Sequence, residues 1–280
     1  MYKCHVCGRQ FLGGFRIDPK HLWHEYQEGK QTHLQLSLKY KCSQRTIQRK
    51  LDLHQIVIDK KQPRSVIVLM DTTYFGRAFG VMLFKDEITK ENLLKYYVKA
   101  ETNALYRKGI EELKSRGFTI KAIVCDGRRG LINSFGEVPV QMCQFHQVAI
   151  IRRYITKRPR LTASIELQEI VWLLTRSDKE SFEGALNDWL VRWESFLKER
   201  TTNLKTGKSH YTHKRLRSAY RSLKTNLPWM FTWYDLIELK IPNTTNAIDG
   251  HFADLKTKLR NHNGLSMNKK MKFINGFFKA

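Results

Sequence analysis

The sequence is poor in acidic residues and in cysteine, and it has no long hydrophobic run. Its 280 residues include 26 Asp and Glu against 50 Lys and Arg, which gives a formal net charge of +24. Apolar runs such as residues 66–70 are far shorter than the roughly 18 residues that a membrane-spanning helix needs. The first residues also lack the apolar stretch of a secretory signal. We therefore predict a cytoplasmic protein without a membrane partner.

The five cysteines are an odd and sparse set, which argues against a disulfide framework and for reduced thiols. Hydrophobic residues make up 41% of the chain, enough to bury a sizeable core, so extensive disorder is excluded. The excess of positive charge indicates a polyanionic partner, with nucleic acid as the first candidate. An anionic membrane surface is the second candidate, although no strongly amphipathic basic helix supports it.

The N-terminal part is predicted to hold two small regions. Residues 1–18 carry a Cys pair but are too few to form a core of their own. Residues 19–62 have helical patterns, with Ser43 as the N-cap of a helix through Leu51. Because a tight turn around Lys41 precedes that helix, we predict a helix-turn-helix.

The middle of the chain has the pattern of a mixed α/β sheet. A helix is predicted at residues 103–116, and strands are predicted at 66–70, 79–84, 93–98, 120–125 and 138–145. This pattern fills residues 63–150. Residues 151–240 have helical patterns rich in Trp, and residues 241–280 form a compact motif with a basic tail.

Two aspartates follow predicted buried strands. Asp71 ends the strand at 66–70, and Asp126 follows the strand at 120–125. A buried carboxylate is costly unless a cation pairs with it, and adjacent strands would place both carboxylates around one Mg²⁺ ion. Two such ions about 4 Å apart could activate a water or a 3′-hydroxyl on a phosphodiester. The alternative is that both are ordinary turn or cap residues.

A third acid lies in a predicted helix near the C-terminus. Thr244 or Thr245 can cap a helix in which Asp249 falls in the early turns. Asn246 and Lys256 lie on nearly the same face, so an amide, a carboxylate and an ammonium could together hold an ion and touch phosphates. The alternative is a solvated helix start.

Five short segments stand out along the chain: DTTYFGR at 71–77, CDG at 125–127, CQFHQ at 143–147, NTTNAIDG at 243–250 and LRNHNGL at 259–265. In this order they resemble the DDE transposases of bacterial insertion sequences. The closest resemblance is to the Mutator-related family, in its variant with a zinc-binding N-terminus, and it covers about residues 1–270.

The resemblance implies an RNase H-like catalytic core whose first part is residues 63–150, a helical insertion at 151–240, and the end of the core at 241–280. It implies that Asp71, Asp126 and Asp249 hold two Mg²⁺ or Mn²⁺ ions. The wider family carries Glu at the third position, where Asp249 has a shorter side chain.

The implied activity is that of a nucleoid-associated transposase that acts on double-stranded DNA as a homo-oligomer. It would bind the terminal inverted repeats, cleave the 3′ ends and join them to target DNA. The alternative is a catalytically decayed or domesticated DNA-binding protein on the same fold.

Further residues receive accessory roles. The resemblance gives Cys143 and His146 a role in shaping the active site, and a buried Cys with an unrelated His is the alternative. Cys4 and Cys7 form one zinc knuckle, whose partner pair lies upstream in similar proteins, so we expect this chain to begin late. The alternative is two metal-free thiols. The predicted DNA-binding residues are Arg45, Arg49, Lys50, Lys256 and Arg260.

Overall fold

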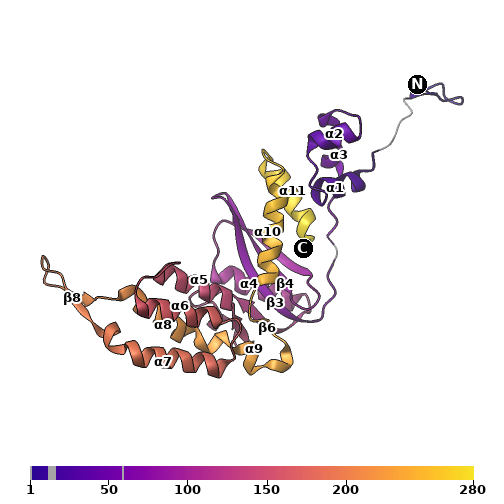
Figure 1. Ribbon diagram of the computed structural model, residues 1–280. Helices are drawn as coiled ribbons and strands as arrows, with labels where there is room; N and C mark the ends of the chain where they lie inside the picture. The colour runs from indigo at the N-terminus through magenta and orange to yellow at the C-terminus, as the bar shows by residue number, and fades with distance from the viewer. Residues whose placement is uncertain (1, 12–16, 59) are drawn as a thin grey trace. The chain divides into compact units, whose positions relative to one another are not determined.

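The computed structural model of the protein describes residues 2–11, 17–58 and 60–280, and these form two compact units (Figure 1). One unit combines Met1–Lys60 with His251–Ala280, and the other is Lys61–Gly250. The boundary after residue 250 therefore falls inside the block predicted at 241–280. Within the described ranges, every helix is too short or too polar to cross a bilayer.

The first unit packs short, individually capped helices from both ends of the chain. Its elements are the hairpin strands β1 (Tyr2–Lys3) and β2 (Gln10–Phe11), and the helices α1 (Pro19–Gln27), α2 (His33–Lys39), α3 (Gln44–Leu53) and α11 (Met267–Phe278). Side chains of Asp18, Thr32 and Ser43 cap α1, α2 and α3 by accepting backbone N–H groups. Gln27 Nε2 donates to the Phe273 carbonyl, so α1 is tied to α11.

The second unit is built on a five-stranded mixed sheet with the strand order β5-β4-β3-β6-β7. β3 pairs antiparallel with β4 and parallel with β6, while β4 pairs antiparallel with β5, and β6 pairs parallel with β7. The helix α4 (Asn103–Ser115) supplies Tyr106 and Ile110 to the buried core of this sheet. The strands are β3 (Ser65–Phe75), β4 (Phe79–Asp86), β5 (Asn92–Val98), β6 (Thr119–Cys125) and β7 (Val140–Met142).

Strand β3 is longer than the predicted strand, so Asp71 lies inside it and not at its end. The parallel pairing of β3 with β6 ends at Leu69 and Val124, but β3 continues against β4, where Asp71 faces Leu83. The tight β3–β4 hairpin extends the strand as far as Phe75. Asp71 therefore sits just beyond the point where β6 ends, which brings it near the residue that follows β6.

The strand predicted at 138–145 is mostly wrong. β7 covers only Val140–Met142, and Cys143 is the N-cap of helix α5 (Gln144–Ile155). Val148, Ile151 and Ile155 are buried at helical spacing, and this burial overrides the local strand pattern. The helix also crosses the boundary that was predicted after residue 150.

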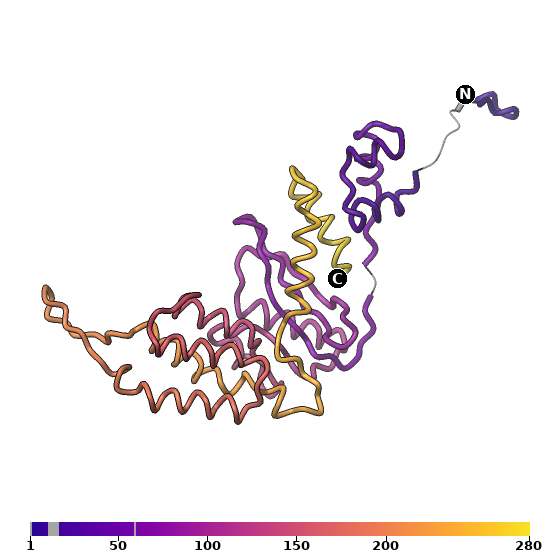
Figure 2. Tube along the Cα trace, in the orientation of Figure 1, coloured from indigo at the N-terminus to yellow at the C-terminus, as the bar shows by residue number. Residues whose placement is uncertain are grey.

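The helical part of this unit forms its own hydrophobic core. Leu167, Trp189 and Leu223 are buried there, and Trp189 Nε1 donates to the Ala163 carbonyl. Trp172, in contrast, is 51% exposed. Figure 2 shows the β8–β9 hairpin projecting beyond the helices. The elements are α6 (Thr162–Leu173), α7 (Lys179–Lys198), β8 (Arg200–Thr202), β9 (Ser209–Tyr211), α8 (Lys214–Met230) and α9 (Thr232–Asp235).

Candidate active site

Asp71, His146 and Asp249 meet in the second unit. One ligand atom from each of the three side chains lies within 4.8 Å of the others. The residues come from β3, from the first turn of α5 and from the start of α10 (Asn246–Arg260). The group joins positions 71 and 249, which are remote in the sequence, and adds a histidine that the sequence placed only as an accessory.

The segment before α10 is held against the start of α5. Gln144 N donates to the Asn243 carbonyl at 2.9 Å, and both the backbone N and the Oγ1 of Thr245 lie 3.3 Å from Cys143 Sγ. The Thr245 carbonyl then accepts the first bonds of α10, and its Oγ1 donates to Asp249 Oδ2 at 3.1 Å. Cys143 therefore positions the helix that carries the third acid.

Asp126 lies near this group but is not one of its three members. It directly follows β6, and its Oδ1 accepts from the backbone N of Arg128 at 3.3 Å. Its negative charge contributes to raising the pKa of both Asp71 and Glu101, which places it beside both carboxylates. Across the described residues, the cluster thus combines a compact trio with one flanking aspartate.

Burial and mutual repulsion make the Asp71 carboxyl harder to ionise, although the charge of His146 opposes this effect. Burial, assisted by the charges of Asp249 and Asp126, raises the pKa of Asp71 to about 7. The interaction with the Cys143 thiol, together with the nearby carboxylates, raises the pKa of His146 to about 9. Repelling carboxylates of this kind are stabilised by a bound cation.

The donor set fits a divalent metal ion. Two carboxylates are hard oxygen donors of the kind that Mg²⁺ and Mn²⁺ take, and ligands on opposite sides of a Mg²⁺ ion lie about 4.2 Å apart. His146 Nδ1 is buried and has no hydrogen-bond partner among the described residues. A buried ring nitrogen without a hydrogen-bond partner is available to a metal ion.

A second layer of polar residues was not predicted from the sequence. Tyr106 OH lies 2.8 Å from both Glu101 Oε1 and Thr72 Oγ1. Arg128 Nη2 donates to the Glu101 carbonyl at 2.8 Å, and Nη1 lies 3.6 Å from Glu101 Oε2. Burial raises the pKa of Glu101. Glu101 closely follows the predicted strand at 93–98, so the signal that singled out Asp71 could also have found it.

The other predicted residues lie outside the trio. Asn246 begins α10 with an exposed side chain, while Arg45 and Arg49 are exposed on α3 and Lys50 is half-buried there. On the later part of α10, Lys256 is half-buried and Arg260 is exposed.

The two N-terminal thiols are close to each other but belong to no metal-ligand group within the described ranges. Backbone N–H groups of Cys7 and Val6 and the side chain of Cys7 lower the pKa of Cys4. The nearby helix α1 carries His21, whose Nε2 lies 3.4 Å from Glu25 Oε1.

Comparison with known proteins identifies the family. A family model described as a transposase of the Mutator family matches residues 86–228, which are 143 of the 280 residues and just over half of the chain. The matched segment contains Asp126, Cys143 and His146. No curated protein matches the chain. The α/β unit and this match together define a transposase. The chain belongs to the Mutator family of transposases.

Proposed function

We propose that the protein binds the terminal inverted repeats of an insertion sequence, cleaves their 3′ ends and transfers them to target DNA. The observation that carries this proposal is the meeting of Asp71, His146 and Asp249 beside Asp126. We also infer that the core is RNase H-like. Three antiparallel strands followed by two parallel ones, with one acid in β3 and another directly after the adjacent strand β6, support this inference.

The residues of the cluster have separable roles. Asp71, Asp126 and Asp249 would hold two Mg²⁺ or Mn²⁺ ions, which when bound lower the pKa of a water and stabilise the leaving oxygen of a phosphodiester. His146 either completes the ligand set or orients the acids. Thr245 and Cys143 fix the start of α10, so the short side chain of Asp249 reaches the site without the extra methylene of Glu.

Sequence recognition is assigned to residues 19–62. Helices α2 and α3 are joined by a short turn in which Lys41 has a positive φ of 49°. Such a helix pair can place its second helix in the major groove of DNA. Arg45 and Arg49 lie one helical turn apart on α3 with exposed side chains, as base or phosphate contacts require.

Two further parts of the proposal concern zinc and assembly. The hairpin that carries Cys4 and Cys7 supplies half of a tetrahedral zinc site, so a second pair of ligands must come from elsewhere. Joining two ends of a mobile element requires two active sites, so we propose a homo-oligomer on DNA.

The test is cleavage of a labelled terminal-repeat duplex in the presence of Mn²⁺. Asp71→Asn is expected to lower cleavage by about a hundredfold or more, because it removes a metal-ligand charge. Glu111→Gln is the matched control, since it removes an exposed carboxylate on α4 and should leave cleavage unchanged. Sequence-specific binding by the wild type without any cleavage would instead support the decayed DNA-binding protein.

A further inference from the structure

A cavity of about 470 Å³ lies next to the acidic cluster. Its wall begins at Gly127, the residue after Asp126, and continues through Arg128 and Arg129 onto helix α8. A Cβ at Gly127 would meet Met142 Cε at 2.1 Å, so the backbone here is packed closely against β7. The cavity therefore adjoins the loop that carries Asp126, and close packing fixes its wall at that point.

The chemistry of this cavity is cationic and aromatic. Arg129 and Arg221 are exposed, and neither guanidinium forms an ion pair with any described residue. The described lining contains no Asp or Glu, but it contains the aromatic rings of Tyr154 and Trp229. Arginines bind phosphate oxygens in a bidentate manner, and aromatic faces stack on unpaired bases.

The wall formed by α8 repeats its polar groups at helical spacing. Ser218, Ser222 and Asn226 form one row with a spacing of four residues. Arg221, Thr225 and Trp229 form a second row with the same spacing. Both rows face the cavity. Asn226 Nδ2 donates to Gln147 Oε1 at 2.8 Å, and Gln147 Nε2 donates to Ser222 Oγ at 3.2 Å. These bonds to α5 fix the wall in place.

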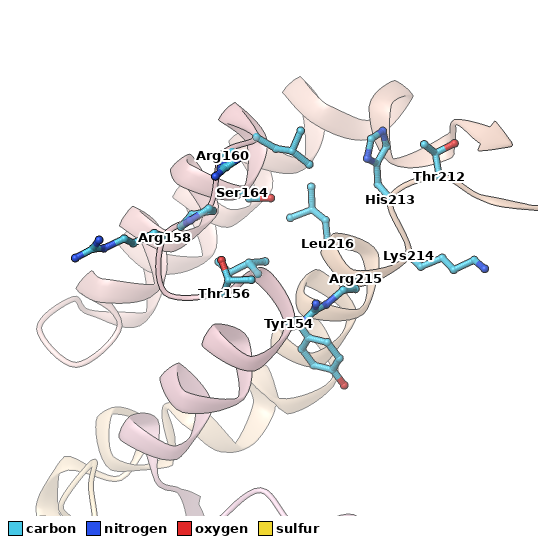
Figure 3. A pocket seen from close by; sticks show the side chains of 13 residues that line it. Tyr154, Thr156, Arg158, Arg160, Ser164, Thr212, His213, Lys214, Arg215 and Leu216 are labelled. Atoms are coloured by element: carbon cyan, nitrogen blue, oxygen red, sulfur yellow. The ribbon is translucent and has the colours of Figure 1, made fainter.

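A second cavity of about 600 Å³ adjoins the first across Tyr154, which lines both. Its described lining also lacks acids and includes Arg158, Arg160, Lys214 and Arg215. Figure 3 shows Tyr154 beside Arg215, with Arg158 and Lys214 extending outward from opposite sides. The two cavities thus form a cationic track that begins at the residue after Asp126 and runs along α8.

We propose that this track binds one strand of DNA next to the scissile phosphate, with Arg129 and Arg221 on backbone phosphates and Trp229 against a base. The proposal rests on the proposed transposase function for the identity of the strand. It makes the helical insertion a substrate-binding surface that guides DNA to Asp126. Double-stranded DNA recognised by α3 would contact a different set of residues.

Binding is measured by fluorescence anisotropy in EDTA, with a labelled duplex that carries an unpaired 3′ extension. Two arginines on phosphates predict that Arg129→Ala with Arg221→Ala weakens binding about tenfold or more near 100 mM salt. The slope of log K against log salt should also become shallower by about 1.4, the value for two phosphates of a single strand. The matched control is Arg192→Ala, because that guanidinium is paired with Glu166 on α6 and lines neither cavity. It should stay within about twofold of wild type.

A second measurement locates the DNA without relying on the folding of those variants. p-Benzoylphenylalanine in place of Tyr154 should cross-link to the unpaired extension on illumination, whereas the same group in place of the exposed Val191 should not. An unchanged salt slope in the folded double variant, or equal cross-linking from both positions, overturns the proposal. Weaker binding by the double variant, together with no cleavage by the wild type, would support DNA binding by the track and contradict the proposed enzymatic activity.

Discussion

At the scale of single residues, Asp86 shows how a buried charge stabilises the sheet. It ends β4 and is fully buried. Arg64 donates to Asp86 Oδ2 from Nε at 3.1 Å and from Nη2 at 2.8 Å, and Thr89 Oγ1 and Ile88 N also donate to this carboxylate. Burial alone would raise the pKa of Asp86, but these hydrogen bonds outweigh burial and hold its pKa below the usual value.

Asp86→Asn is therefore expected to lower the free energy of unfolding by about 1–3 kcal/mol at neutral pH. Because the folded pKa is depressed, the stabilisation is fully present above the unfolded pKa, near 3.9, and is lost as the pH falls through the folded value. Urea denaturation of wild type and variant from pH 7 to pH 3 checks this. A stability difference that stays constant below pH 4 would contradict it, and Glu111→Gln, at an exposed pair, serves as the control.

At the scale of elements, the start of α10 depends on a contact with the start of α5. Thr245 is fully buried, with its backbone N donating to Cys143 Sγ and its Oγ1 donating to Asp249. Thr245→Val keeps the shape but removes the hydroxyl, so we expect about 1–2 kcal/mol lower stability. If the hydroxyl positions Asp249, half-maximal cleavage should also need more Mn²⁺. Thr257→Val on the same helix, where Oγ1 donates to the Ala253 carbonyl within α10, should leave the Mn²⁺ requirement unchanged.

The helices and strands themselves differ in how well the sequence predicts them. The helix at 103–116 and the strand at 120–125 were found to within one or two residues, because their apolar periodicity agrees with their burial. The helical start at Gln144 was missed because the apolar residues before and after it continue a strand-like run. The position of Asp71 inside β3 was also missed, since it depends on pairing with β4 rather than on local pattern.

The candidate site could be predicted only in part. Asp71, Asp126 and Asp249 were singled out by their sequence context, and the structure brings Asp71 together with Asp249. That His146 would join them, with Asp126 at the side, depends on how α5 packs beneath the start of α10. No periodic pattern records such a contact between segments about a hundred residues apart.

At the scale of the whole molecule, the two ends of the chain fold as one unit. Phe273 on α11 is fully buried against Trp23 and Tyr26 of α1, with ring centroids 6.4 and 5.8 Å away. Lys272 Nζ donates to the Leu51 carbonyl at the end of α3. The N-terminal helices, each of ten residues or fewer, are too short to be stable alone, so they depend on α11 for their core.

Phe273→Ala should therefore destabilise helices that lie more than two hundred residues away in the sequence. Removing a buried Phe costs about 3–5 kcal/mol, which is a large share of the stability of so small a unit. Hydrogen exchange should show lost protection at the amides of Leu22, Leu36 and Ile47, while β3 and β6 keep theirs because they belong to the other unit. Met267→Ala, at a 45% exposed position on the same helix, should change neither. Equal loss of protection in the sheet would mean that the two units unfold together.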